Sequence, residues 1–201
     1  MQTIKKHAVL ICIIISVIVM VIATLVYPGG SFINSNSTAF DWSKNTFSNL
    51  FKEKAINGLD NPARYWGIIS VAFQSIGYGL FFIRMSTIIP NKHTTTVLKV
   101  IGFANILFNF LIATSLHDMM VVISSSLSML GLFYITVFIL KTKLHILKTF
   151  CIICMLMFYF TFYTYGAGDW GLLAIMQKVS LIGSMFLVLG LDYFTKDTDF
   201  K

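Results

Sequence analysis

Six long apolar runs occupy most of this 201-residue chain. Each is close to the roughly 20 residues that an α-helix needs to cross the hydrocarbon core of a bilayer. Within that core every backbone polar group must be satisfied internally, which favours helices for segments of this length. The sequence therefore predicts an all-α, polytopic membrane protein with six transmembrane helices, at residues 8–27, 65–83, 97–116, 119–140, 146–165 and 171–191.

The composition leaves no room for a separate soluble domain. Charged residues make up 11% of the chain and hydrophobic residues 57%, whereas soluble domains contain about 25% charged residues. We expect residues 1–201 to form a single transmembrane domain. The first apolar run follows Lys5 and Lys6, but it is longer than the core of a typical signal peptide and no small-residue cleavage site follows it. We expect it to remain as a span.

Basic residues are distributed unevenly between the two sides of the predicted bundle. The net charge is +7, and most lysines fall at the two termini or in the second and fourth connections. Loop 28–64 lies on the other side, where acidic residues offset the basic ones. The positive-inside rule then predicts a multi-pass protein of a cell membrane with both termini in the cytoplasm. Membrane lipids are the expected partners, and nucleic acid is not, because no basic stretch alternates with exposed aromatic residues.

The outer loop, residues 28–64, is the one long connection. Pro28-Gly29-Gly30 predicts a turn directly after the first span. Phe40, Phe47, Leu50 and Phe51 then recur at helix-like spacing. Two arrangements fit this pattern: a short amphipathic helix lying on the outer leaflet, or a loop packed across the outer end of the bundle.

Polar side chains inside the spans are the first candidates for a functional site. Lys178 lies on the sixth span, about 12 Å along the helix from Trp170. It is either a cation that holds an anionic lipid or substrate group, or the ion-pair partner of Asp118 or Asp169. Residues 124–128 are rich in serine, which favours close helix packing.

Asn105 and Asn109 share one face of the third span, and Gln74 of the second span and Gln177 of the sixth lie at comparable depths. Hydrogen bonds between helices explain such residues without any ligand. The sharper hypothesis is a polar cavity that binds a ligand, with Asp41 of the outer loop as a further candidate. Its walls would contain Gln74, Asn109, His117 and Lys178.

An enzymatic site is the alternative. His117 stands at the outer turn of the third and fourth spans and could act as a general base oriented by Asp118, Asp41 or Asp169. The histidines and cysteines lack the spacing of metal ligands, so we expect neither a metal nor a cofactor.

Several short motifs resemble one known group of proteins. They are Tyr27-Pro28-Gly29, residues 45–51, residues 61–65, Leu116-His117-Asp118, and Gln177-Lys178-Val179-Ser180. Together they make the chain similar to the DUF998 group of small bacterial and archaeal membrane proteins, and more remotely to Frag1-like six-span proteins. The DUF998 group implies no established activity. The Frag1-like resemblance implies a role in lipid handling, by analogy of fold.

The leading functional hypothesis is a non-enzymatic or accessory membrane protein that binds a lipid or small amphiphile in an outward-facing pocket. Lys178 and His117 would contact the polar head, and the fifth span would contact the tail through Phe158, Phe160, Phe162 and Tyr163. The alternatives are a membrane-embedded hydrolase or transferase using His117, a small transporter, or a structural subunit. Paired broken helices, which would favour a transporter, are absent from the sequence pattern.

Overall fold

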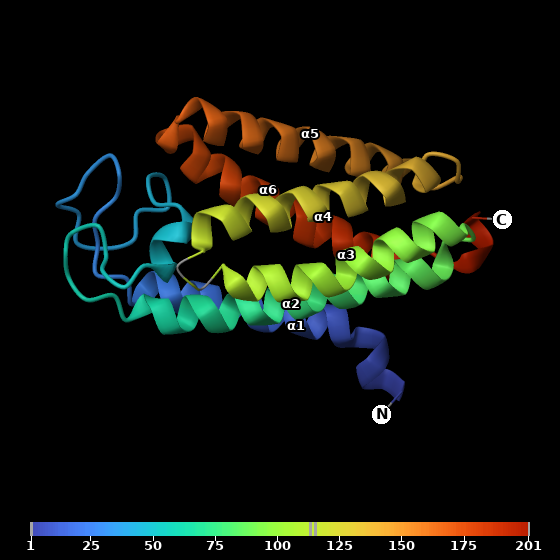
Figure 1. Cartoon of the computed structure of the whole chain (residues 1–201), viewed down its shortest axis with the longest axis horizontal. Helices are drawn as coiled ribbons and strands as arrows, with labels where there is room; N and C mark the ends of the chain where they lie inside the picture. Colours follow the sequence, from blue (N-terminus) through green and yellow to red (C-terminus); the bar gives the residue numbers. More distant parts are fainter. Residues whose placement is uncertain (1, 113, 115, 201) are drawn as a thin grey trace.

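Six long helices form the predicted spans in a computed structural model of the chain. It describes the backbone of residues 2–112, 114 and 116–200, and the side chains of all of these except residues 2–5 and 118. The long helices in these residues are α1 (Gln2–Leu25), α2 (Ala63–Ile88), α3 (Lys92–Leu111), α4 (His117–Ile139), α5 (His145–Ala167) and α6 (Trp170–Phe194) (Figure 1). All six are long and apolar enough to cross a membrane, so the prediction of an all-α, six-span protein is confirmed.

Two short 3-10 helices complete the secondary structure of the described residues. They are η1 (Phe47–Phe51) in the outer loop and η2 (Asp197–Phe200) near the C-terminus. Of the two arrangements expected for the outer loop, the structure has the packed one. Phe40, Phe47 and Leu50 are all buried, and η1 packs against α2 and α6.

The third helix lies about one turn earlier in the chain than its apolar run predicts. The expected span was residues 97–116, whereas α3 begins at Lys92 and ends at Leu111. Its start is fixed by Asn91, whose side chain accepts a hydrogen bond from the backbone N–H of Thr94 at 2.9 Å. The apolar run does not show where this helix ends, because Ile112 and Leu116 continue the run through the turn.

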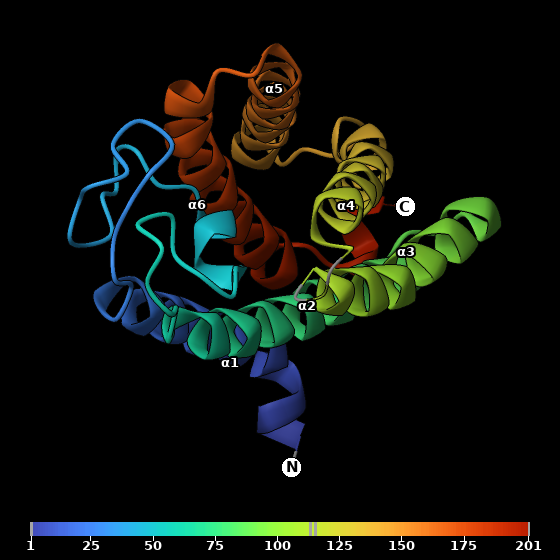
Figure 2. The ribbon, with the colours of Figure 1, turned by 60° about the vertical axis from the view of Figure 1, so that its left-hand side comes forward.

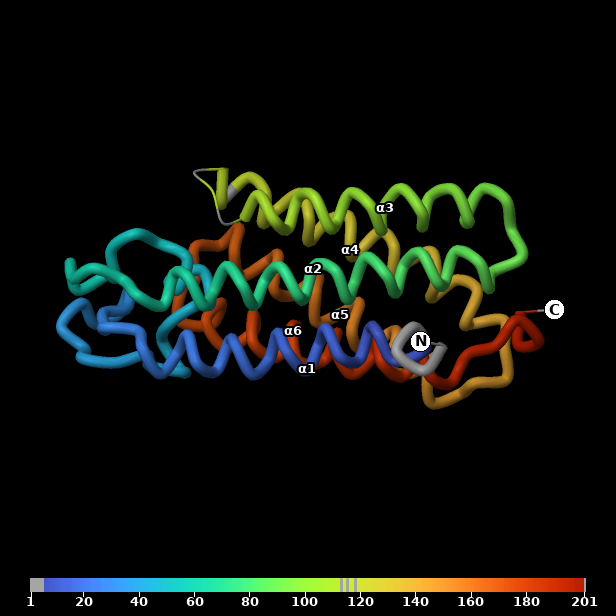
Figure 3. Tube along the Cα trace, turned by 90° about the horizontal axis from the view of Figure 1, so that it is seen from below, coloured from blue at the N-terminus to red at the C-terminus, as the bar shows by residue number. Residues whose placement is uncertain are grey.

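The helices form a ring. α1, α2 and α3 lie in a row (Figure 3). From α3 the ring continues through α4 and α5 to α6, which packs back against α2 and α1 (Figure 2). The two ends of the chain lie at one end of the bundle, and loop 28–62 lies at the other (Figure 1). We call these the terminal end and the loop end.

The terminal half of the ring is densely packed. Phe81 and Phe82 of α2, Ile135 of α4 and Leu191 of α6 are all fully buried there, and they belong to one continuous hydrophobic cluster. The loop half contains a smaller cluster, which joins the outer loop to α1 and α2 around Tyr27 and Leu50. The space between the two clusters is where a site can form.

Glycines allow α2 and α3 to approach closely. A Cβ atom added at Gly79 would lie 2.4 Å from Ile106 and 2.8 Å from the carbonyl oxygen of Gly102. A Cβ atom at Gly102 would lie 2.9 Å from the carbonyl oxygen of Gly79. Small residues at such crossings are the usual means of close helix packing in membranes.

This crossing provides a test of the fold. We predict that Gly79→Ala lowers stability by about 1–3 kcal/mol, the usual result of overpacking, and lowers the melting temperature in detergent. Gly166→Ala is the matched control, because a Cβ atom there would meet nothing within 4 Å. Equal melting temperatures for the two variants would contradict the α2–α3 packing.

Candidate functional site

A cavity of about 410 Å³ lies in the loop half of the ring. Residues of α2, α4, α5 and α6 form its walls, together with the end of α3, and η1 covers it. About one turn further toward the terminal end, Phe82, Leu132 and Val188 are buried in the apolar cluster of the terminal half. The cavity therefore has a packed base. It is covered by η1 and the outer-loop residues that hold η1 in place, which we call the cover.

Three of the predicted ligand-binding residues line this cavity. They are Gln74 of α2, Asn109 of α3 and His117 of α4. Asn109 donates a hydrogen bond to the side-chain oxygen of Asn105 at 3.3 Å, and Ser128 donates to the same oxygen at 2.9 Å. The structure thus brings three of the four residues of the sharper sequence hypothesis to one cavity, and ligand binding there stays a prediction.

Most of the cavity wall is apolar or aromatic. From α5, Phe158 and Phe162 line it. Phe160 and Tyr163, which were also expected to contact a ligand tail, point away: they are 43% and 69% exposed on the outside of the bundle. The reason is the helical period, which places only one face of α5 toward the ring.

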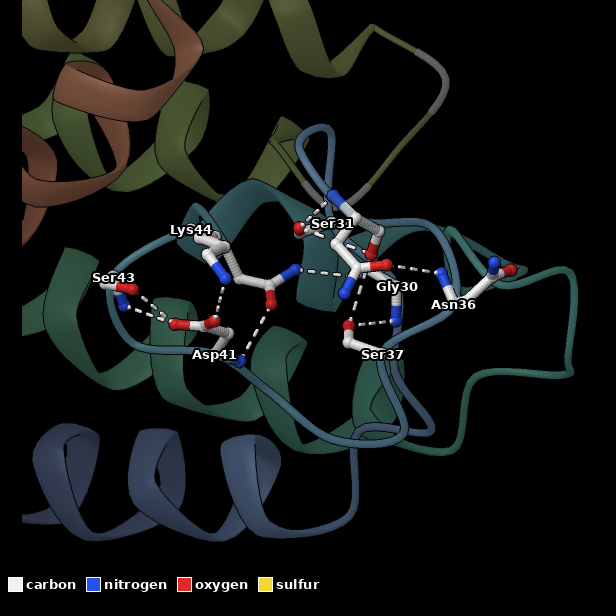
Figure 4. A network of polar contacts seen from close by, with 9 residues as sticks. Gly30, Ser31, Asn36, Ser37, Asp41, Ser43 and Lys44 are labelled. Atoms are coloured by element: carbon white, nitrogen blue, oxygen red, sulfur yellow. Dashed lines mark hydrogen bonds and ion pairs between the residues drawn. The ribbon is translucent and has the colours of Figure 1, made fainter.

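Asparagines organise the cover of the cavity. The amide nitrogen of Asn45 donates to the carbonyl oxygen of Gly30 at 2.7 Å and to the side-chain oxygen of Asn49 at 3.0 Å. The side-chain oxygen of Asn45 accepts from the backbone N–H of Asp41 at 2.8 Å. Figure 4 shows this network of polar contacts, from Gly30 and Ser37 to Asp41 and Lys44. The cover therefore has a defined structure, because its side chains form hydrogen bonds with the backbone of the loop.

Two neighbouring residues of α6 attach the cover to the bundle. The side-chain oxygen of Gln177 accepts a hydrogen bond from the backbone N–H of Phe47 at 2.8 Å. The ammonium of Lys178 donates to the carbonyl oxygens of Asn45 at 2.5 Å and Ala174 at 2.6 Å. It also lies 5.7 Å from the ring centre of Phe40 and 5.4 Å from that of Phe47, within the range of cation–π attraction.

Lys178 occupies a different place from the one predicted for it. It is 7% exposed, and it lies beside the cover and not in the cavity lining. Asp169, one proposed ion-pair partner, instead caps α6 by accepting from the backbone N–H of Leu172 at 3.0 Å. The side chain of Asp118, the other, lies outside the described residues. The sequence could not show this arrangement, because the lysine's partners are backbone carbonyls and aromatic rings that the folded loop supplies.

The hydrolase hypothesis needs a carboxylate beside His117. The Nδ1 atom of His117 instead donates to the carbonyl oxygen of Ile112 at 2.7 Å. Asp41 pairs with Lys44 at 3.3 Å, and Asp169 caps α6. Among the described side chains, no ion pair includes His117, and no group of three or more His, Cys, Asp or Glu residues is arranged to hold a metal ion.

Sequence reasoning missed an ion pair near the terminal end. Asp192 of α6 is 1% exposed, and its carboxylate lies 2.6 Å from the guanidinium of Arg84 on α2. Each residue stands one position beyond the apolar run that predicted its span, so Arg84 fell in the second connection and Asp192 in the C-terminal segment. The helices continue through these positions and place the pair within the bundle.

Comparisons with known proteins identify no relative of this chain. No protein-family model, curated protein sequence or solved structure matches the chain. The resemblance to the DUF998 group stays a prediction.

The outer loop should respond to acid through Asp41. Two hydrogen bonds from Ser43 are the main reason that the pKa of this carboxyl is lowered to about 2. An unfolded chain has an Asp pKa of about 3.9, so ionised Asp41 stabilises the loop above about pH 4 and this contribution is lost as the pH falls toward 2. We predict a change in Trp42 fluorescence over this window, since Trp42 contacts Phe40 and Phe47.

Asp41→Asn should remove this transition, because the amide does not titrate. Asp60→Asn is the matched control: the Asp60 side chain is 96% exposed, so this variant should keep the transition. A transition of unchanged midpoint in Asp41→Asn would contradict the assignment.

Lys178 should determine how firmly the cover is attached. Lys178→Met leaves the Asn45 carbonyl without its donor, which costs about 1–3 kcal/mol when the group stays buried. We predict about tenfold faster hydrogen exchange for the backbone amides of residues 45–51, since about 1.4 kcal/mol corresponds to a factor of ten. Lys143→Met, in the exposed α4–α5 turn, should leave these amides unchanged. Equal exchange in both variants would disprove the attachment.

Proposed function

We propose that the chain is a multi-pass cell-membrane protein that binds a lipid or small amphiphile in the cavity beneath η1. The cavity carries this proposal. Its volume of about 410 Å³ falls within the range of about 300–1,000 Å³ for small-molecule sites, which are largely apolar with a few placed polar groups. An apolar space of this size without an occupant would forfeit packing contacts along its whole wall.

The chemistry of the wall favours an amphiphile. Phe158 and Phe162 offer contacts to a hydrocarbon tail, whereas Gln74, Asn109 and His117 offer hydrogen bonds to a polar head. Because Nδ1 of His117 donates to a backbone carbonyl, Nε2 of the neutral imidazole is left as an acceptor. These three residues therefore offer both hydrogen-bond donors and an acceptor to a polar head.

The proposed orientation places both termini in the cytoplasm and the loop end outside. It is supported by the basic residues of the termini and of the second and fourth connections, and by the position of both chain ends at one end of the bundle. The cavity then opens toward the outer leaflet.

Blocking the cavity tests the function. Ser125 lines the cavity, and a tryptophan there would occupy much of its volume. We predict that lipids retained by the wild-type protein after mild purification, detected by native mass spectrometry, are lost from Ser125→Trp. Leu130→Trp is the matched control, because Leu130 lies on the same helix with 43% of its surface exposed, and it should retain them.

Both variants should first be shown to have wild-type helix content and elution volume. Either of two results would overturn the proposal: wild-type protein that carries no enriched lipid or amphiphile, or Ser125→Trp that binds as the wild type does.

A further inference from the structure

We infer that the ligand is a two-chain bilayer lipid whose head accepts hydrogen bonds beneath η1 and whose chains leave the cavity sideways between α4 and α5. The inference rests on the proposed function and specifies its ligand and its route. Three observations carry it: the divergence of α4 and α5, the aromatic rim at the loop end, and two amide donors with no acceptor among the described residues.

α4 and α5 diverge toward the loop end. They are joined at the terminal end by the turn at residues 140–144, and Figure 1 shows them separating from that turn. Of the consecutive helix pairs that pack directly, they pack least closely. The buried residues that both helices contribute to the common apolar cluster all lie in the halves that adjoin the turn: Leu132, Ile135, Ile139, Leu147, Cys151 and Cys154. The outer parts of α4 and α5 are therefore the weakest contact between consecutive helices of the ring.

The cavity reaches the surface along this divergence. Val122 of α4 lines the cavity and is 38% exposed. On α5, Phe162 also lines the cavity and is partly exposed. We call this opening, between Val122 and Phe162, the α4–α5 seam. Because both helices are membrane spans, a seam between them opens to hydrocarbon and not to water.

An aromatic rim lies at the loop end, where α5 turns into α6 beside the outer loop. Tyr165 and Trp170 have ring centres 6.2 Å apart, and Trp170 lies 5.3 Å from Phe32 of the outer loop. The ammonium of Lys52 stands 5.1 Å from the Phe32 ring centre. All four residues line the cavity. Trp and Tyr gather where headgroups meet hydrocarbon, so the rim marks the headgroup level and the seam below it lies at the level of the chains.

Two amide donors, one in the cover and one on α6, have no acceptor among the described residues. The side-chain oxygen of Asn49 accepts from Thr46 and Asn45 at 3.0 Å each, whereas its buried amide nitrogen has no partner in the described structure. The oxygen of Gln177 is likewise occupied by Phe47, which leaves its amide nitrogen to donate. Both residues line the cavity. A buried donor without a partner costs free energy, and an acceptor on the ligand would remove that cost.

These features define a class of lipid. Ester carbonyl and phosphate oxygens are both acceptors, and Lys52 at the rim adds a positive charge that favours a phosphate. A space of about 410 Å³ suits the head of a glycerolipid, but two long acyl chains exceed what such a site encloses. The chains must therefore pass through the seam into the bilayer, whereas a short single-chain amphiphile fits within the cavity.

Native mass spectrometry with two added probes tests the seam. The probes are dipalmitoyl phosphatidylglycerol and a short single-chain lysolipid. We predict that Val122→Trp lowers occupancy by the two-chain lipid at least tenfold and spares the lysolipid, and that Leu130→Trp spares both. Unchanged two-chain occupancy in Val122→Trp would overturn the seam. Loss of neither probe in Ser125→Trp would instead overturn the cavity as the binding site, so the two failures are distinguishable.

If Val122→Trp does not fold, Val122→Cys provides the same test. Attachment of a bulky maleimide after purification should block the two-chain lipid in a protein that has already folded. Retained two-chain binding after complete labelling would also overturn the seam.

Replacing an amide side chain by a carboxylate of nearly the same shape tests the role of the amide donors. Asn49→Asp keeps the oxygen that accepts from Thr46 and Asn45 but removes the amide donor, and we predict at least tenfold weaker binding of the two-chain lipid. Asn36→Asp, in the exposed part of the same loop, adds the same charge and should bind as the wild type does. Dipalmitoyl glycerol has ester groups but no phosphate, so it distinguishes the two kinds of acceptor. If the wild-type protein binds it as well as it binds dipalmitoyl phosphatidylglycerol, the donors contact an ester. If the wild-type protein does not bind it, the donors contact the phosphate. Undiminished binding of both lipids by Asn49→Asp would overturn the role of the donors.

Discussion

The buried ammonium of Lys178 joins the outer loop to α6, and the loop half of the structure depends on this contact. Its two carbonyl partners belong to different elements: Ala174 to α6 itself and Asn45 to the cover. Gln177, the preceding residue, accepts from the backbone of η1. Together with the apolar cluster that joins the outer loop to α1 and α2, these bonds hold η1 across the outer end of the ring.

The two halves of the bundle differ in the side chains that fill their interiors. The terminal half fills its interior with large apolar side chains such as Phe81, Phe82 and Leu191, and glycines bring α2 and α3 together. The loop half places amides and hydroxyls on the same helices and leaves a space among them. Polar groups are costly in hydrocarbon unless they find partners. Their concentration in one half is the physical basis for assigning the function there.

Particular residues show how far the sequence could predict the site. Gln74, Asn109 and His117 were predicted to share a cavity from their depth and polarity, and all three line one. The same reasoning placed Lys178 there and failed, because depth along a helix does not show which loop lies beside it. Nothing in the sequence singled out Asn49, since asparagines are common in polar loops. Only the folded structure shows that η1 places it at the cavity. Arg84 and Asp192 were missed because an apolar run ends before the helix does.

The sequence by itself determined the six spans and the concentration of polar span residues toward the loop end. These follow from local properties: run length, hydropathy and the positions of polar residues along each helix. Only the tertiary structure decided where α3 ends, how the outer loop covers the ring, that Lys178 fastens it, and that α4 and α5 diverge to leave a seam. Each of these depends on contacts between residues far apart in the chain, whose partners a linear pattern does not specify.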